Sequence, residues 1–187
     1  MKRDTIHFLT QDELRRLLAV LEGPRDVALF YVGYLYGVRA SEIGLLERTH
    51  VDLKNESISI PRLNQDEMMM YDLNPKMVYL LQTLLDSRND EKPILFPNKM
   101  GGPISRRMLD YLMKAYGEAA RLPDEKRHFH ALRHTTAVHL LQATGDIWFV
   151  QKWLGHKNIQ NTMVYTELVD LDWDTRTKEI FSSEKVL

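Results

Sequence analysis

Apolar residues recur along most of the chain at the three- and four-residue spacing of helices. In the first such stretch, four leucines share one helix face, at positions 14, 17, 18 and 21. Ahead of them, Thr10 and Glu13 have the spacing of a capping box, and Gly23-Pro24 should end the helix. Residues 25–36 are apolar nearly all round, which predicts a buried central helix that ends at Gly37. Further helices are predicted for residues 40–46, 75–85, 105–120, 130–143, 147–154 and 159–166.

Between the third and fourth of these helices the pattern changes to alternating residues. Residues 51–53 and 57–60 flank a polar turn, and a third short strand is predicted for residues 69–73. Pro61 should end the second strand or place it at a sheet edge, because proline cannot donate to the ladder. The Met68-Met69-Met70 run is expected to be a strand that faces the core. The fold class predicted is mostly α with a small antiparallel three-stranded sheet.

The composition is that of an ordinary globular protein. The chain has 187 residues, 44% of them hydrophobic, which fits one domain over residues 1–187. It contains no cysteine, so disulfides and thiolate metal sites are excluded. We see no apolar run long enough for a membrane span and no signal peptide at the start of the sequence, and we expect a cytoplasmic protein. No pattern predicts a cofactor, a small-molecule substrate or a bound metal.

The formal net charge of −1 argues mildly against nucleic-acid binding, but the charges are unevenly distributed. Residues 101–165 hold nine Lys and Arg against five Asp and Glu, together with five histidines. The segment after Tyr165 is acidic. A basic face is therefore compatible with a neutral total.

Five residues are candidates for chemistry: Arg39, His130, Arg133, His156 and Tyr165. Taken singly, each has an ordinary structural explanation. An arginine after a helix-ending glycine is usually a solvated cap or an ion pair, and a lone helical histidine is usually a surface or core residue. The order and spacing of the five together carry the functional interpretation.

That order comprises Gly37-Val38-Arg39-Ala40-Ser41-Glu42, then His130-Ala131-Leu132-Arg133-His134, then Leu154-Gly155-His156, with Tyr165 nine residues later. It resembles the signature of the tyrosine recombinases (phage integrase family) over almost the whole chain. In size and in its Phe8-Leu9-Thr10 start, the chain is similar to the short members that invert fimbrial promoters. The resemblance implies a DNA breaking-rejoining catalytic domain that acts on double-stranded DNA as a homo-oligomer, from dimer to tetramer.

The chemistry of the five residues agrees with this resemblance. Breaking a phosphodiester without a metal requires positive charge on the phosphoryl oxygens, which two guanidinium groups, Arg39 and Arg133, can provide. A tyrosine hydroxyl becomes nucleophilic only when its proton is removed. His130 is expected to exchange that proton, and His156 to donate a hydrogen bond to a non-bridging oxygen. Tyr165 would then form a 3′-phosphotyrosyl intermediate and release a 5′-hydroxyl.

One expected residue is missing. The family usually carries a catalytic lysine on a hairpin between the first arginine and the histidine, but residues 60–73 contain no lysine. Asn64 and Gln65 stand where it is expected, and neither is an acid. Arg62 is the nearest cation and a poor proton donor. Three interpretations stay open: Arg62 supports the leaving group, the protein is slow or needs a partner subunit, or it binds DNA without efficient cleavage.

Two other functions remain as alternatives. The chain could be a catalytically weak DNA-binding regulator with the same fold, or, less readily at this length, a type IB topoisomerase-like enzyme. A metal site at His128, His130 and His134 lacks a familiar ligand spacing. Arg106 and Arg107 at a helix start are candidates for phosphate contact, and Trp148 and Trp153 are expected in the core. Residues 168–187 are expected to pack on their own domain or on a neighbouring protomer.

Overall fold

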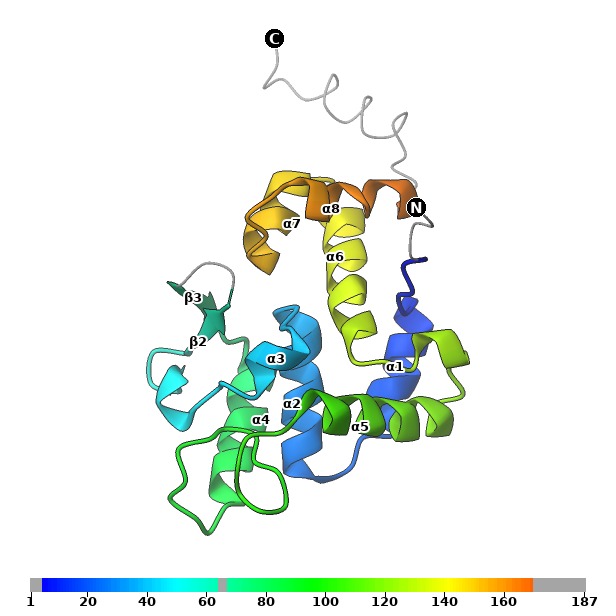
Figure 1. Cartoon of the computed structure of the whole chain (residues 1–187). Coiled ribbons are helices and arrows are strands. Elements are labelled where there is room, and N and C mark those ends of the chain that lie inside the picture. Colours follow the sequence, from blue (N-terminus) through cyan, green and yellow to red (C-terminus); the bar gives the residue numbers. More distant parts are fainter. Residues whose placement is uncertain (1–4, 64–66, 170–187) are drawn as a thin grey trace.

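Helices dominate the chain, as the apolar spacing predicts (Figure 1). The structure is a computed structural model that describes residues 5–63 and 67–169. The α-helices are α1 (Gln11–Ala19), α2 (Gly23–Leu35), α3 (Ala40–Ile43), α4 (Pro75–Asp86), α5 (Arg106–Ala119), α6 (His130–Thr144), α7 (Ile147–Leu154) and α8 (Gln160–Met163). Three short 3-10 turns are η1 (Arg48–His50), η2 (Asp124–Lys126) and η3 (Thr166–Leu168). The predicted mostly helical fold is confirmed.

The helix starts follow from local side-chain chemistry. The capping box before α1 is present: Thr10 accepts a hydrogen bond from the Glu13 amide at 3.2 Å, and Glu13 accepts one from the Thr10 amide at 2.8 Å. The prediction that Gly23-Pro24 ends the first helix was wrong, because α1 already ends at Ala19 with Val20 as its C-cap, and Gly23-Pro24 begins α2 instead. Proline fits the first turn of a helix, where its missing N–H has no intrahelical partner.

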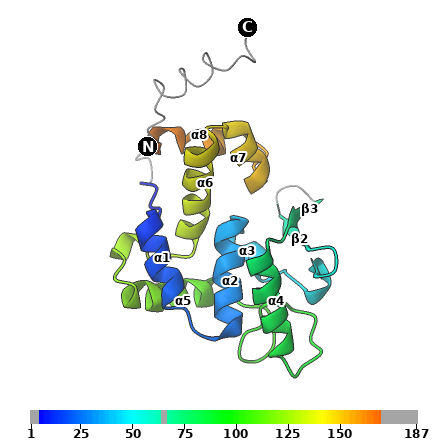
Figure 2. The same cartoon turned by 180° about the vertical axis from the view of Figure 1, so that it is seen from behind.

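Two hydrophobic clusters form the interior, and α6 joins them. The larger cluster surrounds α2, which contacts α1, α4 and α6; Figure 2 shows α2 with α1 on one side and α4 on the other. The smaller cluster lies between α6, α7 and the segment around Tyr165. Leu132 of α6 belongs to the first cluster, whereas Ala137 belongs to the second. The part of α6 between Leu132 and Ala137, which includes Arg133 and His134, therefore lies at the junction of the two clusters.

The sheet has the predicted three antiparallel strands in the order β1-β2-β3, with β1 (Val51–Asp52), β2 (Ser57–Arg62) and β3 (Glu67–Asp72). Strand β2 continues through Pro61, which pairs with Met68 of β3; β1 reaches only Ser57 and Ile58, so Pro61 has no ladder partner on the β1 side.

The expectation that the methionine run faces the core was wrong at two of its three positions. Met68 is 47% exposed and Met70 is 74% exposed, while Met69 packs against the larger cluster. Side chains alternate between the two faces of a strand, so three consecutive residues cannot all face one core.

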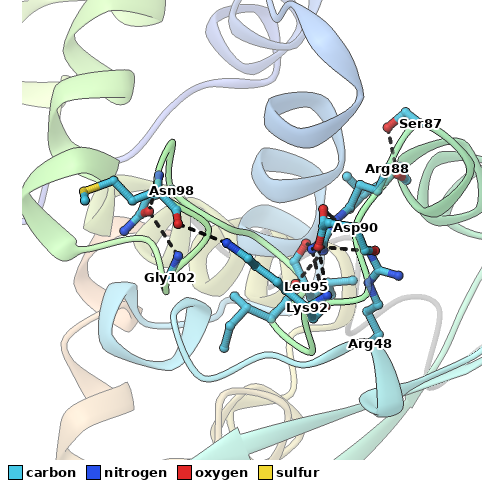
Figure 3. A network of polar contacts seen from close by, with 11 residues as sticks. Arg48, Ser87, Arg88, Asp90, Lys92, Leu95, Asn98 and Gly102 are labelled. Carbon is cyan, nitrogen blue, oxygen red and sulfur yellow. Dashed lines mark hydrogen bonds and ion pairs between the residues drawn. The ribbon is translucent and has the colours of Figure 1, made fainter.

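A long connection between α4 and α5 is ordered by polar contacts rather than by regular structure (Figure 3). Asp90 accepts hydrogen bonds from both Nε and Nη2 of Arg88, and its backbone oxygen accepts one from Arg48 at 2.5 Å. The Asn98 side chain accepts hydrogen bonds from the Met100 and Gly102 amides. The Arg88 side chain is thus a nearly buried structural arginine of this connection. The connection itself lies at the end of the molecule away from α7 and α8 (Figure 1).

Some expectations for the C-terminal third need correction or fall outside the described residues. Trp153 packs between the clusters as predicted, but Trp148 is 67% exposed on the first turn of α7 and is not a core residue. Among the described residues, none of the helices has both the length and the apolar character needed to cross a membrane. The docking expected of residues 168–187 lies outside the described residues beyond Val169.

Candidate active site

All five residues predicted from the sequence line one cleft of about 900 Å³, and His134 lines it with them. The cleft lies between the start of α3, the first half of α6 and the α8–η3 segment. On the side of the α8–η3 segment, Gln160 and Asn161 also line the cleft. Residues from positions 39 to 165 thus meet in one place, although their catalytic roles stay predictions.

The local backbone explains how each side chain reaches the cleft. Gly37 has the left-handed φ of 55° after α2, and Arg39 follows as the N-cap of α3. Gly155 has a φ of 64° at the end of α7, and His156 comes next. In both places a left-handed residue turns the chain sharply, which glycine allows without a steric penalty. Tyr165 stands between α8 and η3.

Arg39 is fixed by a fully buried carboxylate. Glu42 accepts a hydrogen bond from Nη1 of Arg39 at 2.6 Å and another from the Arg39 amide at 2.9 Å. Burial alone would raise the pKa of Glu42, but the hydrogen bonds from Arg39 and the charges of Arg39 and Arg62 together lower it. Glu42 is therefore ionised and orients the Arg39 guanidinium, whose side chain keeps 20% of its exposure at the cleft. Glu42 belongs to the sequence motif, but the motif alone predicted no such role for it.

Arg133 is almost completely buried and binds backbone oxygens. Its Nη1 donates to the carbonyl of Gly37, and its Nη2 donates to the carbonyl of Leu154 at 2.8 Å. Burial, with Arg39 next, lowers the pKa of Arg133 to about 9, which still leaves it charged at neutral pH. These two bonds leave further guanidinium N–H groups for a ligand in the cleft that Arg133 lines.

Tyr165 is held by His134, not by His130. The Tyr165 hydroxyl lies 2.9 Å from Nδ1 of His134, and the tyrosine is 3% exposed. His130 contacts His134 through an edge-on ring pair with centroids 4.5 Å apart. His134 was considered from the sequence only as part of the motif and of a metal cluster. Its i, i+4 relation to His130 on one helix face was the available sign that both rings share the site.

His156 is oriented by a neighbouring hydroxyl. Its Nδ1 lies 2.9 Å from Oγ1 of Thr162, a buried residue of α8. This contact leaves Nε2 as the ring nitrogen available to a ligand in the cleft. Burial, followed by Arg133 and Arg39, lowers the pKa of His156 to about 3.

The histidines of the cleft are neutral at neutral pH in the free chain. Burial is the main cause in each case, and nearby positive groups add to it, so the pKa of His130 falls to about 4 and that of His134 to about 3. Burial also raises the pKa of Tyr165, while Arg133 and Arg39 lower it. A neutral His134 can accept a proton from Tyr165, and the surrounding positive charge favours an anionic ligand.

The proposal that Arg62 supports the leaving group directly was wrong. Its side chain is fully buried, forms an ion pair with Glu42 at 3.0 Å, and is not among the residues that line the cleft. A side chain enclosed in this way cannot approach a DNA phosphate at the hairpin tip. Residues 64–66, where the lysine was expected, lie outside the described residues. Within the part of the chain that is described, no group of three or more His, Cys, Asp or Glu side chains suits a metal ion.

Comparison with known proteins identifies the family. The model of the phage integrase family matches residues 7–171. The chain belongs to the phage integrase family. Tyrosine recombinase XerC of Actinobacillus pleuropneumoniae serotype 7 is 35% identical over 147 residues, 77% of this chain and 47% of XerC. The type 1 fimbriae regulatory protein FimB of Escherichia coli K12 is 34% identical over 168 residues, 86% of this chain and 84% of FimB.

Solved structures agree with the fold of this phage integrase family member. The XerH site-specific recombinase bound to difH substrate, in its pre-cleavage complex, superposes with a TM-score of 0.77 at 25% identity. The match covers 97% of this chain and 55% of the XerH chain. The chain spans about half the length of XerC and most of the length of FimB. The resemblance stated from the five-residue pattern is confirmed.

Proposed function

We propose that the chain is a site-specific DNA recombinase that cleaves and rejoins duplex DNA through a 3′-phosphotyrosyl intermediate at Tyr165. The observation that carries the proposal is the cleft itself, where a tyrosine hydroxyl, two buried or half-buried arginines and three neutral histidines converge. Membership of the phage integrase family supports it. So does the DNA-bound XerH structure with the same fold.

In this mechanism Arg39 and Arg133 bind the scissile phosphate. Guanidinium groups fork onto phosphate oxygens and stay charged, so they compensate the negative charge of the phosphoryl transition state. His156 donates to a non-bridging oxygen through the nitrogen that Thr162 leaves free. The arginines are held before DNA arrives, by Glu42 in one case and by backbone carbonyls in the other. Such preorganisation avoids rearrangement during the reaction.

Proton transfer starts from the contact between Tyr165 and His134. Tyr165 oxygen forms a bond to phosphorus, the bond from phosphorus to the 5′-oxygen breaks, and the tyrosine proton goes to a neutral histidine. His134 holds that hydroxyl in the free chain, and His130 is the neighbouring ring that the sequence motif predicts to exchange the proton. The leaving 5′-oxygen takes its proton from water, because no lysine stands between residues 60 and 73. Cleavage should therefore be slow.

A second surface supports binding of the DNA beside the cleft. Arg106, Arg107 and Lys114 share a face of α5 with Tyr111, around a surface hollow. Arg106 is 80% exposed along its side chain, and its contact with Asp110 is long, at 3.9 Å. Burial is the main cause of the lowered pKa of His130, and the charge of Arg106 adds a smaller contribution to it. Exposed cations on one helix face are suited to phosphate contacts.

Assembly and the C-terminal segment are part of the same proposal. We infer that the protein acts as a homo-oligomer on paired DNA sites in the cytoplasm, with residues 168–187 packed in cis or on a neighbouring protomer. A chain truncated before Leu168 should then lose stability or the ability to pair two sites. A truncated chain that recombines as fast as the full chain would refute the role of this segment.

A catalytically weak DNA-binding regulator is the second candidate. The observation that favours it is the hairpin sequence, in which Asn64 and Gln65 replace the expected acid. FimB, similar over most of its length, is described as a regulatory protein. This candidate predicts tight binding of a specific duplex without covalent attachment.

Covalent capture separates the two candidates. The full chain would be incubated with a pool of randomised duplexes, each nicked so that cleavage releases a short fragment with a free 5′-hydroxyl, whose loss prevents rejoining. The recombinase proposal expects protein–DNA adducts that survive denaturation and are enriched in one sequence. Enrichment of bound DNA without any adduct would support the regulator instead.

A further inference from the structure

Two buried arginines, Arg62 and Arg133, both donate hydrogen bonds to the C-terminal ends of α2 and α7. Nη2 of Arg62 donates to the carbonyl of Tyr36 at 2.8 Å and to that of Trp153 at 3.3 Å. Arg133 donates to the next carbonyl at each place, Gly37 and Leu154. These four oxygens lie at the C-terminal ends of α2 and α7, where carbonyls lack intrahelical partners and favour a cation.

Each of these two helix ends leads directly to a cleft residue. The end of α2 continues through Gly37 to Arg39, and the end of α7 continues through Gly155 to His156. A shift at either end therefore moves a side chain that we assign to the phosphate. Gly155 also rests on Arg62 itself, since a Cβ built there would lie 3.3 Å from Cγ of Arg62.

Arg62 reaches Arg39 by a second route. Its Nη1 donates to Oε2 of Glu42 at 3.0 Å, and the other carboxylate oxygen accepts from Arg39. Glu42 is fully buried between the two guanidinium groups. Tyr71 closes the arrangement, because its hydroxyl accepts from Arg62 at 2.5 Å and donates to the Trp153 carbonyl at 2.6 Å.

We propose that Arg62 is a positioning residue that sets Arg39 and His156 for the scissile phosphate, from inside the base of the hairpin whose tip lacks lysine. The inference rests on the proposed recombinase function. In this proposal Arg62 does not itself contact the DNA. It explains why a fully buried arginine stands on β2, although its Nε has no hydrogen-bond partner in the described residues and a buried charge is costly.

The charge of Arg62 also contributes to the electrostatics of the cleft at His156. After burial, the charges of Arg133, Arg39 and Arg62 together oppose protonation of His156 and lower the pKa of that ring. Glu42 offsets one of these three positive charges, so the buried cluster remains positive toward an anion. A lysine at position 62 would keep the charge but could not fork onto Glu42 and two carbonyls at once.

The competing explanation is that Arg62 serves folding alone. Arg88 provides a matched control, because it is also a nearly buried arginine that binds a carboxylate and backbone carbonyls, in the connection between α4 and α5. Arg62→Lys and Arg88→Lys would be compared with the unchanged chain at a temperature where all are folded by circular dichroism. Tyr71→Phe is the milder second variant, since it removes one partner of Arg62 and leaves the arginine in place.

The measurement is the single-turnover cleavage rate with saturating nicked duplex of the captured sequence. A positioning role predicts that Arg62→Lys slows this rate about 10–100-fold, the size of effect known for groups that orient the ligands of metal sites. Tyr71→Phe should slow it less, and DNA affinity should change little in either variant. Arg88→Lys should lower the thermal midpoint without slowing cleavage.

A substrate with an uncharged linkage separates a positioning role from a folding role, because a loss of folding alone would slow cleavage equally on charged and uncharged substrates. In a methylphosphonate linkage one charged oxygen is replaced by methyl, so less positive charge is required from Arg39. The deficit of Arg62→Lys should then shrink on this substrate. Equal rates for Arg62→Lys and the unchanged chain on the phosphodiester would overturn the inference, as would an equal deficit on both substrates. An unchanged chain that forms no adduct would instead refute the proposed function.

Discussion

The hydroxyl of Tyr165 and Nδ1 of His134 lie 2.9 Å apart in a nearly closed environment. The proposed nucleophile is therefore partnered before DNA arrives, and its partner is a histidine one helical turn after the one expected. A neutral imidazole can hold the hydroxyl and accept its proton, whereas a charged one could only donate. The same hydrogen bond therefore contributes to the stability of the free chain and is the proposed path of the tyrosine proton in the first chemical step.

The hydrogen bond should be measurable as a coupling energy. His134→Ala leaves the buried tyrosine hydroxyl unpaired and should lower the free energy of unfolding by about 1–3 kcal/mol. Tyr165→Phe removes the hydroxyl as well, so the double variant should lose less than the sum of the two single changes. A double-mutant cycle by urea denaturation checks this. Fully additive effects would mean that the hydrogen bond contributes nothing to the folded chain.

Acid should destabilise the free chain in the range where histidines titrate. The folded chain lowers the pKa of His130 to about 4 and the pKa values of His134 and His156 to about 3, and also lowers those of His128 and His139. The unfolded chain therefore binds more protons below pH 6.5. The stabilisation is complete above that pH and is lost as the pH falls toward the folded values.

The free energy of unfolding should then fall from pH 7 to pH 5, by at most about 1.4 kcal/mol per pH unit for each histidine. The lowered carboxylate pKa values of Glu13 and Glu42 act at lower pH and do not contribute in this window. His156→Asn should flatten the pH dependence measured by urea titration. A stability that is constant between pH 7 and pH 5 would contradict the burial of these rings.

Phosphate binding by α5 should appear in the salt dependence of DNA affinity. Replacing Arg106 or Lys114 by alanine should weaken binding to all duplexes and reduce the slope of log affinity against log salt by about 1 for each phosphate that is no longer neutralised. Arg15→Ala, an exposed change on α1, serves as the control. Slopes that stay equal across the three variants would remove α5 from the DNA interface.

The missing proton donor predicts a specific chemical rescue. If water protonates the leaving oxygen, a substrate with sulfur at the 5′-bridging position should be cleaved much faster, because a thiolate leaves without a proton. General acids contribute about 100-fold or more, so a gain of that order is expected. Gln65→Lys should speed cleavage of the oxygen substrate and show a smaller gain with sulfur. A large gain in both proteins would show that the introduced lysine does not reach the leaving group.

The sequence was sufficient for the parts of the molecule that depend on local chemistry. The Thr10–Glu13 capping box, the left-handed Gly37 and the central apolar helix α2 were all predicted from short-range patterns and are confirmed. The five candidate residues were found because they stand in a characteristic order, and the structure brings them to one cleft. Motif order carries information about three-dimensional proximity that single residues do not.

What the sequence did not determine depends on long-range packing. Whether His130 or His134 meets Tyr165 is decided by how Tyr165 packs with α6 in the smaller cluster, and Tyr165 is 31 residues away from His134 in sequence. The burial of Arg62 depends on helix ends at Tyr36 and Trp153, which no local pattern connects to β2. The prediction for Trp148 was wrong because a large apolar residue at helical spacing usually packs inward, and here the first turn of α7 projects outward.

The most direct test of the proposed mechanism is the identity of the residue that becomes attached to DNA. Adducts formed by the full chain with a nicked duplex would be digested with trypsin and nuclease, and the modified peptide sequenced by mass spectrometry. We expect a nucleotide 3′-phosphate on Tyr165 and no adduct with Tyr165→Phe. Attachment at another residue, or an adduct that persists in Tyr165→Phe, would contradict the mechanism.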